Sequence, residues 1–196
     1  MVKKLFEQNC VFNSFAPGET IPVNDYIKNR KLAKYYNRET QAALVTAGML
    51  FKENMPEKNI PIFYATGIVE REEYDLNKIA HHSLDESGHY SNRFFIGKGM
   101  MQISPLTQFK VLYNMTLCFI SIEHGLQGDN AAIYSSAQGL VMNAMYSTYA
   151  DKVVIGAGKV YANGIVESGF ARVSKKELEG MAGVDFEMEA IELFKI

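Results

Sequence analysis

The stretch that decides the fold runs from residue 120 to residue 139 and reads ISIEHGLQGDNAAIYSSAQG. A helical pattern of apolar residues ends at Gly125, and a Gly-Asp-Asn turn follows it. The apolar run 131–134 is too short for a helix and is bounded by turn residues, which favours a β-strand. Either Ser135 or Ser136 is suited to cap the helix that comes next. The stretch therefore predicts a helix, a strand and a second helix in succession.

The segments on either side continue this alternation. Ser104-Pro105 places a proline at the first position of a helix, which we expect to run to about His124. A second helix is expected over Ser136–Tyr149. After it, residues 152–157 (KVVIGA) form an apolar run that ends at a glycine. Such a run is typical of a strand that is covered on both faces of a sheet.

The same patterns recur toward both ends of the chain. Residues 11–15 favour a weak first strand, and apolar or small residues at helical spacing lie between Asn29 and Phe51. Residues 60–66 (IPIFYAT) favour a second buried strand. Residues 184–196 begin with strict alternation of apolar and charged residues, which favours an edge strand with a bulge. Strands alternating with helices predict an α/β fold with five strands in a mainly parallel sheet.

The composition fits a single domain over residues 1–196 and argues against several kinds of partner. Apolar residues make up 47% of the chain and charged residues 21%, which is ordinary for a globular protein. A net charge of −2 without a basic run does not favour nucleic-acid binding. Neither a secretory segment nor a membrane-spanning run is visible. Cys10 and Cys118 are too few for a disulfide framework. We therefore expect a cytoplasmic protein that binds neither nucleic acid nor membranes.

The order of these segments resembles the N-terminal half of β-ketoacyl synthases, members of the thiolase-like superfamily. In that family a long helix ends at a glycine and a Gly-Pro-Asn-like turn follows. A short strand then delivers a cysteine to the N-terminus of a buried helix. The segments of this chain that carry the resemblance are Arg38–Leu44, Ile62–Gly67, Ile120–Asn130, residues 131–134, Ser135–Gly139, Ala150–Gly158 and Val184–Leu193.

The resemblance implies a thiolase-like half-domain and a dimer. Its five-stranded mixed sheet would have strand order 3-2-1-4-5, with the last strand antiparallel, and would lie between helices. Ketosynthases are dimers in which the third strand pairs with its counterpart across a two-fold axis. The resemblance places this dimer edge strand on Asn130, Ala131, Ala132, Ile133 and Tyr134. An exposed strand edge also needs a cover for physical reasons.

Two departures from the family argue against ketosynthase chemistry. The family's cysteine falls on Ala137, with Ser136 and Gln138 as neighbours, and no cysteine follows Cys118. The condensation reaction needs a thiolate at this helix end. The family's catalytic histidines belong to a C-terminal half that has no counterpart here, and they are not replaced by His81, His82, His89 or His124. We therefore expect a degenerate site without catalytic residues or a cofactor, in a pseudoenzyme.

Several side chains have an alternative, structural interpretation. Ser136 lacks the Gly-x-Ser-x-Gly pattern of a hydrolase, so helix capping explains it better than nucleophilic catalysis. Chain-length factors, the inactive partners of type II polyketide ketosynthases, resemble ketosynthases with glutamine in place of the cysteine. Gln138 lies one position from that site, and its amide could fill an oxyanion hole or simply lie in the first helical turn. At the end of a helix, His124 is suited to interact with the helix dipole.

No metal or nucleotide site is expected. The spacing of the polar cluster between residues 81 and 89 matches no zinc pattern, which favours a solvated loop; its members are His81, His82, Asp85, Glu86 and His89. None of the glycines forms a Gly-x-Gly-x-x-Gly loop between a strand and a helix.

Three functions stay open at this point. The first is a non-catalytic partner subunit of an active ketosynthase in fatty-acid or polyketide biosynthesis, with an acyl carrier protein as an indirect contact. The second is a homodimeric protein that keeps the fold and binds an acyl group or another small molecule. The third is a hydrolase or acyltransferase that uses Ser136.

Overall fold

The computed structural model describes residues 9–53, 55–67, 76–104, 112–146, 149–181, 183 and 187–195. Contacts divide the chain into two compact units. The sheet unit comprises Met1–Arg71 and Tyr113–Ile196, and the helical unit comprises Glu72–Leu112. That the two form one ketosynthase-like domain over residues 1–196 stays a prediction.

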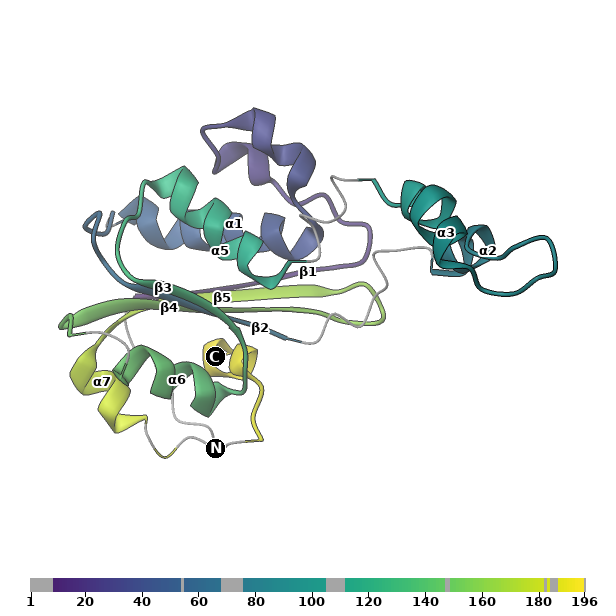
Figure 1. Cartoon of the computed structure of the whole chain (residues 1–196). Helices are drawn as coiled ribbons and strands as arrows, with labels where there is room; N and C mark the ends of the chain where they lie inside the picture. The colour runs from purple at the N-terminus through teal and green to yellow at the C-terminus, as the bar shows by residue number, and fades with distance from the viewer. Residues whose placement is uncertain are drawn as a thin grey trace. The chain divides into compact units, whose positions relative to one another are not determined.

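A five-stranded mixed sheet lies at the centre of the sheet unit (Figure 1). Its strands lie in the order β1-β5-β4-β2-β3. Strand β2 is parallel to both of its neighbours, whereas β5 is antiparallel to β4 and to β1. The strands are β1 (Cys10–Phe15), β2 (Ile62–Thr66), β3 (Asn130–Tyr134), β4 (Lys152–Val160) and β5 (Val166–Ser174). The α/β class and the mixed five-stranded sheet are thus confirmed, but the prediction of a mainly parallel sheet is wrong, because β1 and β5 both pair antiparallel.

The predicted strand order 3-2-1-4-5 is wrong for two reasons: it placed β1 between β2 and β4, which pair directly, and it omitted β5. This strand follows β4 through a tight hairpin that is closed by a hydrogen bond from the Tyr161 N–H to the Ile165 oxygen (2.9 Å). Gly164 takes a left-handed conformation in the turn (φ +86°), which glycine adopts without strain. A hairpin keeps its strands adjacent, so β5 lies between β4 and β1, and β1 becomes an edge strand. The Asn163-Gly164 pair was an available signal for this hairpin.

The closing strand predicted at the C-terminus is also wrong where the structure describes it. Residues 184–186 lie outside the described part of the chain. Ala190–Phe194 form a 3-10 helix, η5, in which four side chains are buried. Before it, a single antiparallel bridge joins Glu189 to Ser136. The position of a closing antiparallel strand is taken by β5 instead.

Helices cover both faces of the sheet, as Figure 1 shows. One face, here the α1 face, is covered by α1 (Arg38–Glu53) and α5 (Tyr113–His124). The opposite α6 face is covered by α6 (Ala137–Tyr146), α7 (Lys175–Gly180) and η5. All five side chains of β2 are buried, because Ile62 and Tyr64 enter the α1 face while Phe63 and Ala65 enter the α6 face.

The helix boundaries follow the predicted signals in most places. Helix α5 ends at His124, and Gly125 has a φ of +68°, typical of a helix stop. The continuous helix predicted from Ser104-Pro105 is wrong where it can be checked, because Leu112 is not helical and α5 begins at Tyr113; residues 105–111 lie outside the described chain. Helix α6 ends at Tyr146, three positions before the predicted end at Tyr149. The pattern between Asn29 and Phe51 divides into a 3-10 helix, η2 (Arg30–Tyr35), and α1.

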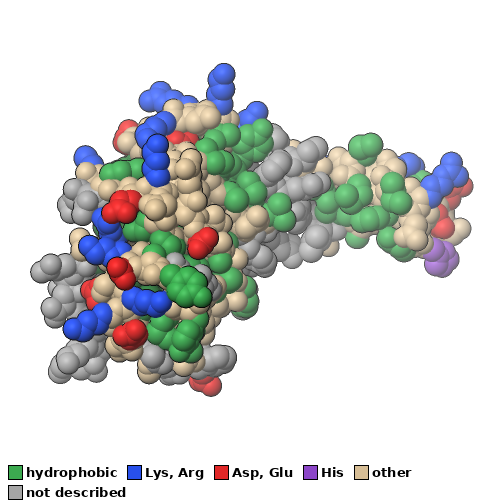
Figure 2. Space-filling view, turned by 60° about the vertical axis from the view of Figure 1, so that its left-hand side comes forward, with side chains coloured by type: hydrophobic (Ala, Val, Ile, Leu, Met, Phe, Trp, Pro, Cys, Tyr) green, Lys and Arg blue, Asp and Glu red, His purple; other side chains and the backbone are tan. Residues whose placement is uncertain are grey.

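The helical unit consists of short elements. These are α2 (Leu76–His82), α3 (Asn92–Phe94), a π-helical turn η3 (Phe95–Gly99) and a 3-10 turn η4 (Met100–Gln102). A bridge between Leu84 and Tyr90 closes the loop that follows α2. Several large apolar side chains of this unit are exposed, among them Tyr90, Ile96 and Met101, and hydrophobic side chains gather on it in Figure 2.

Candidate functional site

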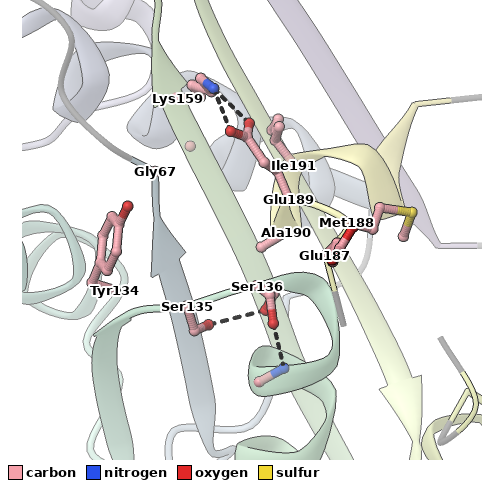
Figure 3. Close-up of a pocket in the computed structure, with 12 residues that line it drawn as sticks. Gly67, Tyr134, Ser135, Ser136, Lys159, Glu187, Met188, Glu189, Ala190 and Ile191 are labelled. Carbon is pink, nitrogen blue, oxygen red and sulfur yellow. Dashed lines mark hydrogen bonds and ion pairs between the residues drawn. The ribbon is translucent and has the colours of Figure 1, made fainter. Parts of the chain in front are cut away.

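A pocket of about 440 Å³ opens where the parallel strands β2, β3 and β4 approach their carboxyl ends (Figure 3). In open α/β sheets, ligands bind outside the carboxyl ends of the strands. The pocket also includes the junction at which the nucleophile was expected. It is lined by Gly67, Tyr134, Ser135, Ser136, Gly139, Gly158, Lys159, Glu187, Met188, Glu189, Ala190 and Ile191.

Ser136 caps helix α6 at this junction. Its Oγ accepts a hydrogen bond from the Gly139 N–H (3.3 Å), and its carbonyl accepts one from the Leu140 N–H (3.0 Å). The Ser135 hydroxyl donates to the Ser136 carbonyl at 3.1 Å. No histidine is among the described residues that line the pocket. The Ser136 hydroxyl therefore has the capping role that was predicted for it.

Ala137, the position predicted for the lost nucleophile, is fully buried and does not line the pocket. Its N–H donates to the Met188 carbonyl at 2.8 Å. An oxyanion hole at this position would need that N–H as a donor, and a main-chain carbonyl occupies it instead. Gln138 is half-buried and is also not a lining residue. The side chains that the junction presents to the pocket are those of Ser135 and Ser136.

The pocket contains an ion pair that was not among the predicted site residues. Lys159 lies near the end of β4, and its Nζ is 2.5 Å from Oε1 and 2.6 Å from Oε2 of Glu189. The Tyr161 ring lies 4.9 Å from the same Nζ, a favourable position for a cation. A lysine inside a run of otherwise buried strand residues was an available signal, because a buried charge requires a partner.

A second group of charges fixes the end of η5 to the β4–β5 hairpin. Lys195 Nζ lies 2.8 Å from Glu167 Oε2 and 2.7 Å from Glu192 Oε1. The Tyr161 hydroxyl donates to Glu167 Oε2 at 2.6 Å. Partial burial opposes the charge of Lys195, but the hydrogen bonds with Glu167 and Glu192 prevail and raise its pKa. These contacts hold the chain that follows the pocket-lining segment 187–191.

Two buried glutamates lie on the α1 face, and neither lines the pocket. Glu39 Oε1 accepts hydrogen bonds from the Tyr64 hydroxyl (2.8 Å) and the Thr66 hydroxyl (2.9 Å). Burial raises the pKa of Glu39 despite these two donors. Gly158 is required beside this group, because a Cβ at that position would clash with the Tyr64 hydroxyl. Glu123 of α5 is equally buried.

None of the described pocket-lining residues is a histidine. His81, His82 and His89 belong to the helical unit, where Asp85 Oδ1 accepts hydrogen bonds from the Ser87 and His89 N–H groups. Among the described residues, no group of three or more His, Cys, Asp or Glu side chains could hold a metal ion.

His124 does not carry the charge that the helix-dipole interpretation requires. Burial, with the charge of Lys28 as a second cause, lowers the pKa of His124 to about 4. The ring is therefore neutral near pH 7 and contacts the Phe51 ring edge to face, with 4.8 Å between the ring centroids. The prediction of a dipole interaction at this position is wrong, because the neutral ring lacks the positive charge that the interaction needs.

The predicted dimer strand β3 does lie at one edge of the sheet. The Ile62 N–H donates to the Asp129 carbonyl, and Ile62 is in register with Asn130. In a parallel pair this register turns the backbone groups of Ala131 and Ile133 toward β2. Those of Asn130 and Ala132 point away from β2, toward the sheet edge.

Surface charge and helix composition can be compared with the expectation that the protein binds neither nucleic acid nor membranes. On the face shown in Figure 2, Lys and Arg side chains are interspersed with Asp and Glu over the sheet unit. Within the described ranges, no helix has both the length and the apolar character needed to cross a membrane.

No protein-family model matches this chain, and no curated protein matches its sequence. Solved structures do match. One is a chain of the complex AntDE:AntF, described as a type II PKS acyl-carrier protein in complex with its ketosynthase bound to the hexaketide. It has a TM-score of 0.50 and 10% identity, over 80% of this chain and 51% of that chain. Another is the ishigamide ketosynthase/chain length factor, with a TM-score of 0.47 and 12% identity, over 83% of this chain and 37% of that one.

The match to the AntDE:AntF complex shows that the fold is ketosynthase-like. This chain spans about half the length of the chain it matches there (51%). At 10% identity the likeness concerns the fold, and activity has to be argued from the site.

Proposed function

We propose that this protein is a non-catalytic subunit that pairs with an active ketosynthase in fatty-acid or polyketide biosynthesis. The observation that carries the proposal is the junction at the start of α6. In a ketosynthase-like fold, the helix end that would hold a thiolate has the capping hydroxyl of Ser136 and the buried methyl group of Ala137. The Ala137 N–H is bound to the Met188 carbonyl, so an oxyanion is not accommodated there.

The edge strand β3 supports pairing with another chain. The backbone groups of Asn130 and Ala132 point toward the sheet edge, and such edges are templates for a further strand. Between the exposed ends of β3, the side chains of Ala131, Ala132 and Ile133 are half-buried. A ketosynthase strand added at this edge would continue the sheet across the interface. An acyl carrier protein would then contact the ketosynthase and reach this subunit only indirectly.

Co-expression tests the proposal directly. The chain is expressed alone and together with the ketosynthase encoded nearest to its gene, and native mass spectrometry measures the assemblies. We expect a complex containing one copy of each chain. A stable homodimer that does not bind the ketosynthase would contradict the proposal and favour the homodimeric binding protein.

A pair of proline variants locates the interface. Ala132→Pro removes an N–H that points toward the β3 edge and leaves the bonds to β2 in place. Ser14→Pro is the matched control, because Ser14 is exposed on β1 at the opposite edge and the register turns its N–H away from β5. We expect Ala132→Pro to abolish the complex and Ser14→Pro to preserve it, with thermal unfolding confirming that both variants fold.

The pocket favours the homodimeric binding protein as a second candidate. A volume of about 440 Å³ lies within the range of small-molecule sites. The oligomeric state measured above separates this candidate from the first. The hydrolase or acyltransferase that uses Ser136 receives no comparable support, because its hydroxyl caps α6 and no histidine is among the described lining residues.

A further inference from the structure

The two partners of the Lys159–Glu189 ion pair differ in their exposure. The Lys159 side chain is 9% exposed, whereas the Glu189 side chain is 48% exposed. A buried ammonium group needs an anion beside it, because removing a charge from water is costly. A half-exposed carboxylate can rotate into water at little cost. The anion of this pair can therefore be exchanged, while the cation is fixed.

The lysine is held in position by its surroundings. Its aliphatic stem passes close to Gly67, where an added Cβ would lie 3.3 Å from the Lys159 Cγ. The Gly67 N–H donates to the Gly158 carbonyl at 2.8 Å, which fixes the end of β2 against β4. With the Tyr161 ring on another side, the ammonium group is placed against Glu189, as Figure 3 shows.

The backbone of Glu189 is fixed independently of its side chain. It forms the antiparallel bridge with Ser136, and its carbonyl accepts a hydrogen bond from the Glu192 N–H (3.0 Å). The carboxylate can thus leave Lys159 by side-chain rotation alone, without opening the pocket wall. The neighbouring residues Ala190 and Ile191 give that wall an apolar surface next to the ion pair.

We propose that the pocket binds a small aliphatic carboxylate, whose anionic end replaces Glu189 on Lys159 and whose hydrocarbon chain contacts Ala190 and Ile191. A site of about 440 Å³ has room for such a molecule. The proposal goes beyond a role as a ketosynthase partner and does not depend on it, because every residue involved belongs to this chain.

Glu189 is an internal competitor for the same cation. A tethered group acts at an effective concentration in the millimolar range or above, so the wild-type protein binds carboxylates weakly. Glu189→Gln removes the competing charge and keeps the size of the side chain. We expect this variant to bind the ligand at least about tenfold more tightly than the wild type.

The experiment titrates the full chain with sodium butanoate at constant ionic strength and follows binding by NMR. Butanamide serves as the matched ligand, since it has nearly the same shape and no charge. We expect butanoate to bind the wild type weakly and Glu189→Gln more tightly, while butanamide binds neither. Equal binding of the two ligands, or no gain in Glu189→Gln, overturns the proposal.

Two further variants assign the effect to the ion pair. Glu192→Gln removes the same charge from the same segment, but Glu192 pairs with Lys195 and does not line the pocket. Its affinity for butanoate should equal that of the wild type. Lys159→Met should abolish the gain when combined with Glu189→Gln, and thermal unfolding checks its fold. An equal gain in Glu192→Gln would contradict the proposal, whichever oligomer the protein forms.

Discussion

The two faces of the sheet use glutamate in opposite ways. On the α1 face, Glu39 and Glu123 are each 4% exposed and accept hydrogen bonds from groups fixed by the fold. The core of the α6 face is formed by apolar residues. On this face, the side chain of Glu189 is half-exposed and pairs with Lys159. The pocket-lining residues on this side, Glu189 and Ser136 among them, form the rim of the α6 face.

Both kinds of glutamate belong to the sheet unit, and they differ in how firmly their carboxylates are held. Glu123 accepts hydrogen bonds from the N–H groups of Lys28 and Asn29 and from the Tyr36 hydroxyl. Its carboxylate therefore holds a loop and a 3-10 helix against α5. Such a group cannot turn toward a ligand without leaving three donors unsatisfied. Glu189, by contrast, lines the pocket, and its half-exposed carboxylate can exchange Lys159 for water.

The largest loss of stability is expected from a substitution that removes a buried carboxylate on the α1 face. Glu123→Gln keeps one acceptor oxygen and turns an NH₂ group toward the donors of Lys28 and Asn29. We expect the free energy of unfolding to fall by about 2 to 3 kcal/mol, measured by urea denaturation. Glu189→Gln should cost about 1 kcal/mol or less, because water reaches that carboxylate. Equal losses in the two variants would remove the distinction between the faces.

A pH titration of stability sharpens the comparison further. The pKa of His124 is lowered to about 4 in the fold and is about 6.5 in an unfolded chain. The unfolded state therefore binds the proton first, and stability falls as the pH drops from about 6.5 toward 4, by at most about 1.4 kcal/mol per pH unit. His124→Leu, compared with the wild type by denaturation between pH 7 and 4.5, should lack this fall.

Glu39 changes stability with pH in the opposite direction from His124 and therefore provides the control. Burial raises its pKa, so its contribution is complete below the unfolded pKa and is lost as the pH rises through the folded value. Glu39→Gln should therefore gain stability relative to the wild type as the pH rises. A wild-type profile that neither variant alters would contradict both assignments.

The smallest effect is expected at the rim of the α6 face. Ser136→Ala removes the cap of α6 and should lower the free energy of unfolding by about 1 kcal/mol, as seen in thermal or urea denaturation. Ser135→Ala is the matched control and should cost less, because the Ser135 hydroxyl donates only to the neighbouring carbonyl. Mass spectrometry after incubation with acyl thioesters should find no adduct on Ser136; an adduct would support the hydrolase or acyltransferase instead.

Much of the local structure could be predicted because its signals lie within a few residues. The stop at Gly125, the strand 130–134 and the capping of α6 by Ser136 all depend on adjacent positions. The sequence patterns did not predict strand β5 although Asn163-Gly164 marks its hairpin, because the preceding strand was expected to end at Gly158, whereas β4 continues to Val160. The charge of His124 was misjudged, since burial depends on distant chain segments.

The sequence by itself determined the alternation of strands and helices and the residues at the start of α6, because periodicity and capping act over one or two turns. Only the tertiary structure decided the strand order, the hydrogen bond from the Ala137 N–H to the Met188 carbonyl, and the pairing of Lys159 with Glu189. These contacts join segments that are far apart along the chain. Their geometry is fixed by packing of the whole core, and local signals such as Asn163-Gly164 or Lys159 mark one side of a contact without naming its partner.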